Sequence, residues 1–148
     1  IFISGLKSEL YLETTKMLSD GKINVDNIKG SFFIEGPNSK LKSDEIFIEG
    51  SKINGSFEIV NGKRNISNLI VEDNEKLNIK TKDTVMFSKK AVYNKKTSII
   101  ELFDEVQIKK GNEIITGDYG IFNTLKNSYK VSSKNSNKVK VVIVESNE

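Results

Sequence analysis

Four acidic residues recur at regular intervals and are the first candidates for chemistry in this sequence. Glu9, Asp44, Asp83 and Asp118 are spaced 35, 39 and 35 residues apart, and an apolar residue follows each of them within four positions. Carboxylates can coordinate calcium or hydrolyse glycosides, but both sites require several oxygen ligands or a second carboxylate nearby. Because the local sequence offers no such partners, we expect the four acids to shape turns by accepting hydrogen bonds from backbone N–H groups.

The amino-acid types that are missing exclude most other chemistry. The chain of 148 residues has no histidine and no cysteine. Without histidine it lacks the usual general base near neutral pH and the commonest zinc ligand, and without cysteine it has neither disulfides nor a thiolate nucleophile. We therefore predict that the protein is not an enzyme and has no catalytic residues, no metal site and no cofactor.

Lysine supplies nearly all of the positive charge. The net charge is +3, from 23 basic and 20 acidic residues, and Arg64 is the only arginine. Since arginine is the preferred side chain for bidentate recognition of phosphates and bases, its near absence argues against nucleic-acid binding. Lysine pairs could contact the phosphates of an anionic lipid or of nucleic acid, although such pairs more often lie at solvated turns. The pairs are Lys89-Lys90, Lys95-Lys96 and Lys109-Lys110.

The elements that position these residues are short β-strands. Between Ile100 and Ile108, apolar and polar residues mostly alternate, which is typical of a half-buried antiparallel strand. Similar stretches recur along the chain between turns rich in Gly, Asn, Asp, Ser and Lys, and Asn61-Gly62 is the strongest hairpin signal. About twelve to fifteen strands and no long amphipathic helix predict an all-β protein with a single domain, residues 1–148.

Two segments leave alternatives open. Ser8–Leu18 has apolar residues at both strand and helical spacing, and we favour strand with one helical turn near Lys16. Val139–Val144 is apolar on both faces, so it is either an edge strand open to strand addition or a strand buried on both sides. The longest apolar run is far shorter than the roughly 18 residues that cross a membrane. Because the chain begins at Ile1, we expect that a signal peptide or anchor has been removed.

A family resemblance emerges over about 85–144. Glu105-Val106-Gln107-Ile108 is followed by a turn of Lys, Gly and Asn, then by Ile114–Asp118, and then by Phe122. The segment Ala91-Val92-Tyr93-Asn94 precedes this unit. The pattern resembles the repeating unit of the OstA-like family, whose members are periplasmic proteins of lipopolysaccharide transport. The resemblance implies an elongated, twisted open β-jellyroll of many short antiparallel strands, and the spaced acids predict about four repeats of roughly 36 residues.

The resemblance also implies a function and partners. The protein would be a periplasmic lipopolysaccharide carrier or bridge that shields acyl chains in an apolar groove on the way to the outer membrane. Its ends would pair head to tail with copies of itself and with the β-jellyroll domains of the inner- and outer-membrane transport components. Two alternatives remain open. One is the periplasmic domain of an LptC-type inner-membrane anchor of the same pathway, and the other is a structural β-solenoid or adhesin-like domain with a sealed core.

The groove would be lined by apolar residues on the inward face of the predicted strands. Exposing a methylene to water costs about 0.8 kcal/mol, so a dry trough of such residues could cover an acyl chain. From the residues alone, the same set could equally fill a closed hydrophobic core, and only the resemblance favours a groove. The predicted lipid-binding residues are Ile46, Ile48, Phe57, Ile59, Leu77, Ile79, Val85, Phe87, Val106, Ile108, Tyr119, Ile121, Tyr129 and Val131.

Overall fold

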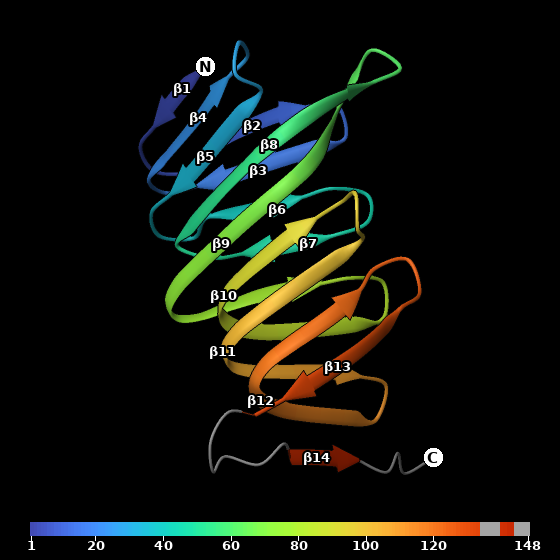
Figure 1. Ribbon diagram of the computed structural model, residues 1–148. Helices are drawn as coiled ribbons and strands as arrows, with labels where there is room; N and C mark the ends of the chain where they lie inside the picture. The colour runs from blue at the N-terminus through green and yellow to red at the C-terminus, as the bar shows by residue number, and fades with distance from the viewer. Residues whose placement is uncertain (134–139, 144–148) are drawn as a thin grey trace, which may run out of the picture.

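A single antiparallel sheet makes up the whole described fold. The computed structural model describes residues 1–133 and 140–143, which form fourteen β-strands in one open sheet. The sheet folds over on itself, so that one layer lies in front of the other (Figure 1). This all-β, open jellyroll architecture confirms the fold class that the sequence predicts.

The two layers share four long strands. Layer A also contains β1 (Phe2–Ser4), β4 (Lys22–Asp26), β5 (Ser31–Glu35), β8 (Lys52–Val60) and β13 (Ser128–Ser132). Layer B also contains β2 (Ser8–Leu12), β3 (Thr15–Ser19), β6 (Lys40–Lys42), β7 (Phe47–Glu49) and β14 (Lys140–Ile143). The strands that run through both layers are β9 (Lys63–Lys80), β10 (Thr84–Asn94), β11 (Ile99–Lys110) and β12 (Glu113–Asn123).

β-Bulges fold the long strands from one layer into the other. The β10–β11 register shifts between Phe87 and Lys90, and the β11–β12 register shifts between Phe103 and Val106. Asp104 and Glu105 have positive φ angles of 67° and 51° there. An unpaired residue bends its strand sharply, so these positions form a continuous folded edge that we call the spine. At the opposite edge, which we call the seam, the hairpin turns of the two layers face each other (Figure 1).

The hairpins follow the turn chemistry of the sequence. Asn61 and Gly62 both adopt positive φ, 52° and 76°, as a two-residue turn between right-twisted strands requires. The segment Ser8–Leu18 is also a hairpin, with β2 and β3 paired from Leu12↔Thr15 outward. The helical turn expected near Lys16 is wrong, because the chain reverses at Glu13, whose φ is 52°, and Lys16 lies within β3.

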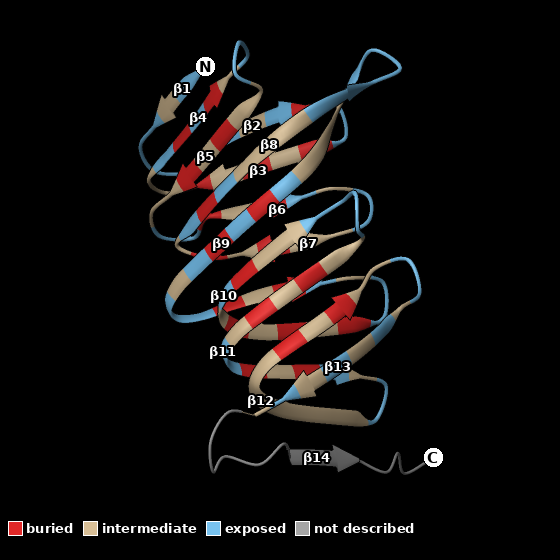
Figure 2. Ribbon diagram, in the orientation of Figure 1, coloured by how far each residue is buried: buried red, intermediate tan, exposed pale blue. Residues whose placement is uncertain are grey.

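The core is a layer of apolar side chains between the two halves of the sheet. Twenty hydrophobic residues among those described are buried, and eleven of them are completely inaccessible to solvent, including Met17, Ile34, Leu41, Met86 and Leu102. Buried and accessible positions alternate along the strands, which gives the striped pattern of Figure 2. This alternation is the period-two pattern of strands with one buried face.

The predicted segment Val139–Val144 lies only partly within the described residues. β14 pairs antiparallel with β12, from Glu113↔Ile143 to Thr116↔Lys140. Val139 and Val144, the ends of the apolar segment discussed above, lie outside the described residues. Within the described ranges, the structure contains no helix of the length and apolarity needed to cross a bilayer.

Candidate functional site

A cavity opens along the seam between the hairpin turns of the two layers. It has a volume of about 930 Å³. Its floor is apolar and is formed by Ile46, Ile66, Tyr93 and Phe122. Its rim is polar, with hydroxyl, amide, carboxylate and ammonium groups, among them Thr14, Ser43, Asp83, Lys82 and Asn127. The seam therefore contains an apolar pocket whose opening is polar and charged.

Asparagine side chains shape the layer A turns around this mouth. Asn94 Oδ1 accepts a hydrogen bond from the N–H of Lys96 at 2.9 Å. Asn123 Oδ1 accepts from the N–H groups of Leu125 and Lys126 at 3.0 and 2.9 Å. Such side-chain bonds replace the backbone bonds that a strand would make, so they stop β10 and β12 at the seam and turn the chain back.

The hairpin turns of each layer form one side of the seam, which we call the layer A lip and the layer B lip. Three polar contacts, which we call the latches, connect the two lips. Asn127 Nδ2 donates to Asp83 Oδ2 at 2.8 Å, and Lys110 Nζ donates to the backbone oxygen of Asn127 at 2.6 Å. Near the N-terminal end, the N–H of Arg64 donates to Glu13 Oε2 at 3.2 Å. The hydrogen bond from Asn127 holds the pKa of Asp83 below its ordinary value, which stabilises its charged form.

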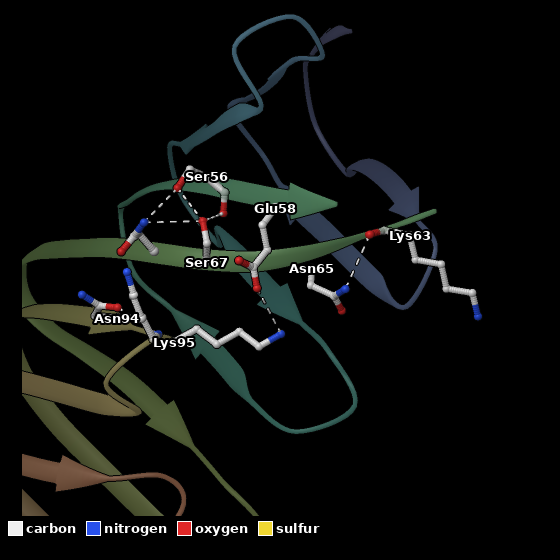
Figure 3. A network of polar contacts seen from close by, with 9 residues as sticks. Ser56, Glu58, Lys63, Asn65, Ser67, Asn94 and Lys95 are labelled. Carbon is white, nitrogen blue, oxygen red and sulfur yellow. Dashed lines mark hydrogen bonds and ion pairs between the residues drawn. The ribbon is translucent and has the colours of Figure 1, made fainter. Parts of the chain in front are cut away.

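The layer A lip is braced by its own polar network (Figure 3). Lys95 Nζ lies 3.8 Å from Glu58 Oε1, and the N–H of Lys95 donates to the oxygen of Ser67 at 3.0 Å. The hydroxyls of Ser56 and Ser67 are hydrogen-bonded at 2.9 Å. Because these contacts join the β8–β9 hairpin to the β10–β11 turn, the two segments form one lip.

Tyr93 places a polar tip on the floor of the cavity. Burial raises the pKa of its hydroxyl, and the nearby Glu45 carboxylate raises it further. The phenol is consequently neutral across the physiological pH range and is able to donate a hydrogen bond. The floor thus combines an apolar ring with one hydroxyl donor.

Behind the cavity, the interior is filled by the protein's own side chains. Ile48, Leu77, Ile79, Val106 and Ile108, five of the residues predicted to line a groove, are between 0 and 1% exposed and belong to the core. The two layers are in direct contact there. The cavity of about 930 Å³ therefore lies at the seam, and the core side chains behind it pack against one another.

Four more of the predicted residues are half-buried and pack on the edge of the core: Ile46, Phe57, Tyr129 and Val131. Of the fourteen predicted residues, Ile46 alone also lines the seam cavity. Phe57 instead packs against Phe32, with the ring centroids 4.7 Å apart. Whether any of these residues contacts a lipid stays a prediction.

The inward orientation predicted for five residues is wrong. Val85, Phe87, Tyr119 and Ile121 lie on the outer face, and Ile59 is 68% exposed near the tip of the β8–β9 hairpin. The Phe87 ring lies 4.0 Å from Lys76 Nζ, and the Tyr119 hydroxyl donates to Glu101 Oε2 at 2.6 Å. In β10 and β12 the alternate residues, including Met86 and Phe122, face the core instead.

The recurrent acids do not share one structural setting. Asp44 and Asp83 lie in layer B turns at the seam, whereas Glu9 is within β2 and Asp118 is within β12 near its bend. In the described part of the chain, no group of acidic side chains could hold a metal ion. The lysine pairs lie at bends and strand ends, where Lys89 Nζ is 3.8 Å from Glu105 Oε1.

Sequence reasoning missed Ile66 and Phe122 as floor residues and used Tyr93 only as part of a motif. Tyr93 and Phe122 both belong to the segments that carry the family resemblance, so that motif was the available signal. Ile66 gave no signal because a bulge between Ser56 and Phe57 changes the face on which it lies.

Comparisons with known proteins agree with this architecture. The model of the family described as OstA-like protein matches residues 55–145. A solved structure of LptH from Pseudomonas aeruginosa, described as the LptA homologous periplasmic component of the lipopolysaccharide transport device, is similar with a TM-score of 0.73. It is 11% identical in sequence, and the alignment covers 88% of this chain and 95% of LptH. No curated protein sequence matches. Because the family model spans more than half of the chain, this protein belongs to the OstA-like family.

Proposed function

We propose that this protein is an LptA-type periplasmic carrier that shelters the acyl chains of lipopolysaccharide in the seam. The observation that carries the proposal is the cavity of about 930 Å³ with an apolar floor along the open edge of the sheet. Pockets for small-molecule ligands have volumes of roughly 300–1,000 Å³ and are mostly apolar with a few polar groups. Membership of the OstA-like family and the likeness to LptH support this substrate.

The driving force is the removal of hydrocarbon from water. Each methylene that leaves water contributes about 0.8 kcal/mol, so an acyl chain of 12 to 14 carbons gains roughly 10 kcal/mol by lying on the floor. The contacts of such a chain are non-directional, which lets the lipid slide along the seam. The sugar head group stays at the polar rim, where water and hydrogen-bonding side chains solvate it.

Separating the two layers should also require the least free energy at the seam. Two of the three latches, Asn127 to Asp83 and Arg64 to Glu13, are solvent-exposed, and exposed polar pairs contribute little stability. The spine, in contrast, consists of continuous strands. An acyl chain that is too long for the cavity would first separate the two lips of the seam. It would then enter between the two layers and contact the buried core residues behind Ile66.

The ends of the sheet support the proposed partners. β1 and β2 lie at one end of the strand order, and β13 and β14 lie at the other. Unpaired strands at sheet edges recruit further strands by backbone hydrogen bonding. We propose that residues 1–148 act as one domain that pairs head to tail with copies of itself and with jellyroll domains at the two membranes. A non-catalytic role in the periplasm follows from this transport function.

Site-specific photo-crosslinking tests the proposal. A photoreactive amino acid at Ile66 or Tyr93 should label radiolabelled lipopolysaccharide, because both side chains lie on the cavity floor. The same group at Ile70, on the outer face of layer A, is the matched control and should label little. Equal labelling at all three positions, or none at position 66 or 93, contradicts binding in the seam.

A sealed structural domain is the second candidate. The specific observation that favours it is the filled core, in which eleven hydrophobic residues among those described are completely inaccessible to solvent. Such a domain would give no labelling at Ile66 and would stay one size in gel filtration as its concentration rises. A carrier that bridges membranes should instead form growing end-to-end oligomers.

A further inference from the structure

A row of lysine and apolar side chains crosses the outer face of layer B beside the seam. The row takes one residue from each strand, in the order in which the strands are hydrogen-bonded. From β3 to β11, the paired positions are Lys16, Lys42, Phe47, Lys80, Val85 and Lys109. These residues flank the layer B hairpin turns, so the row runs parallel to the seam. We refer to its four cations as the lysine row.

The charges of the lysine row are not neutralised by carboxylates. Within residues 1–133 and 140–143, none of the four lysines forms an ion pair. Aromatic rings hold the ammonium groups instead: Lys42 and Lys80 lie 5.3 and 5.7 Å from the centre of Phe47. Lys109 lies 5.3 Å from the centre of Phe87. Cation–π contacts position an ammonium group without cancelling its charge, so the row stays positively charged, although the Glu9 carboxylate acts electrostatically on Lys16.

The spacing of the row suits a ligand with several anionic groups. Hydrogen-bonded strands are about 4.8 Å apart, so Lys42, Lys80 and Lys109, which lie on every second strand, are roughly 10 Å from one another. Lys16 extends the row by one strand beyond Lys42. Lysine binds phosphate as a mobile point charge, and aligned charges of one sign reinforce each other's field.

The row shares residues with the seam cavity. Phe47 and Lys80 belong both to the row and to the cavity lining. An amphiphile whose chain lies on the cavity floor would therefore meet these cations as soon as its head group passed over the layer B lip. The opposite lip differs, because its Lys95 is paired with Glu58 and its tip residue Leu125 is an apolar side chain that is 82% exposed.

We propose that the lysine row binds the phosphate groups of the amphiphile whose acyl chains occupy the seam. This inference rests on the proposed function and adds to it an orientation: the head group lies over layer B and not over layer A. The lipid would then be held at two places, by hydrocarbon contacts inside the seam and by charge on one side of it.

The test compares two probes, intact lipopolysaccharide and lipopolysaccharide whose phosphates have been removed enzymatically. The row variant combines Lys16→Gln, Lys42→Gln, Lys80→Gln and Lys109→Gln. We expect it to bind the intact lipid at least tenfold more weakly than the wild type and with less dependence on salt, because fewer phosphate contacts are made. Binding of the dephosphorylated lipid should be unchanged.

A charge-matched variant of layer A is the control. It combines Lys29→Gln, Lys52→Gln, Lys63→Gln and Lys96→Gln, all of which alter exposed side chains, and it should bind both probes as the wild type does. Thermal melts verify that each variant is folded. If the row variant is not folded, the single change Lys80→Gln should still weaken binding of the intact lipid severalfold.

The outcomes separate the two proposals. If the wild type binds neither probe, the proposed function and this inference both fail. If the wild type binds both probes equally and the row variant does the same, the inference fails and the proposed function stands. If the row variant keeps its affinity for lipopolysaccharide but no longer sediments with phosphatidylglycerol vesicles, the row serves a bilayer surface and the inference is overturned.

Discussion

The substitution Ile66→Asn should weaken the hold of the seam on an acyl chain. Ile66 is half-buried, packs on the edge of the core and forms part of the cavity floor. Ile70 lies four residues further along the same strand, β9, and is 41% exposed. Its neighbours Leu69 and Val71 face the core, so Ile70 points outward. Ile70→Asn is therefore the same chemical change on the opposite face.

The expected loss of binding affinity follows from the length of acyl chain that Ile66 contacts. A chain on the cavity floor would contact its side chain over about two to three methylenes, each contributing about 0.8 kcal/mol when it is dry. Replacing the butyl group by an amide removes this shelter, a loss of about 2 kcal/mol, which corresponds to roughly thirtyfold weaker binding. Ile70→Asn leaves the floor intact and should change affinity less than twofold.

The assay is displacement of an environment-sensitive fluorescent probe by lipopolysaccharide, with the wild type and both variants at equal folded concentration. Circular dichroism melts establish that concentration, because Ile66→Asn also removes core contacts. Equal affinities for folded Ile66→Asn and Ile70→Asn would refute the reasoning, since they would mean that the chain does not touch the floor.

Three further predictions concern the frame around the seam. Asp83→Ala should lower stability at pH 7, because the carboxylate accepts the cross-seam bond from Asn127 and its pKa is held below the ordinary value. Because the pKa of Asp83 is lower in the folded state than the unfolded value near 3.9, its charged carboxylate stabilises the fold above about pH 3.9. This stabilisation is lost as the pH falls through the folded-state pKa. In urea titrations, the difference in unfolding free energy between Asp83→Ala and the wild type should therefore vanish in acid. Gly21→Ala should cost about 2–3 kcal/mol in urea denaturation, since a Cβ there would collide with the backbone oxygen of Glu35 where β3 passes into β4; no loss would contradict this packing. Ile48→Ala should cost about 3 kcal/mol and lower the melting temperature, because the side chain is completely buried, and a neutral effect would mean that the core is loosely packed.

The sequence alone determined the strands and their turns. Alternation of apolar and polar residues is a local property, and so is the preference of Asn61-Gly62 for positive φ at both positions. The lack of His and Cys likewise excludes imidazole- and thiolate-based chemistry from the sequence alone. These features depend on residues only a few positions apart, so they can be predicted from the sequence without the tertiary structure.

The face on which each residue lies depended on the bulges. In β12, Ile115 faces the core opposite Ile108, but Gly120 and Phe122 do so opposite Leu102 and Ile100. The inward residues thus change from odd to even positions along β12, because at the bulge two residues of β11, Asp104 and Glu105, lie opposite the single residue Asp118. Continuing the odd pattern through the bend led to Tyr119 and Ile121, which point outward.

Only the tertiary structure decided where the empty space lies. The segment Val85-Met86-Phe87 is apolar at three successive positions, so its sequence does not show which face is buried. In the structure Met86 faces the core, because it pairs with the core residues Ile79 and Ile108 across the sheet. The seam likewise brings Ile46, Ile66 and Phe122 together from three separate hairpins. Local sequence sets the period of a strand, whereas pairing register and bulges, which involve residues far apart in the chain, set which side of it meets a ligand.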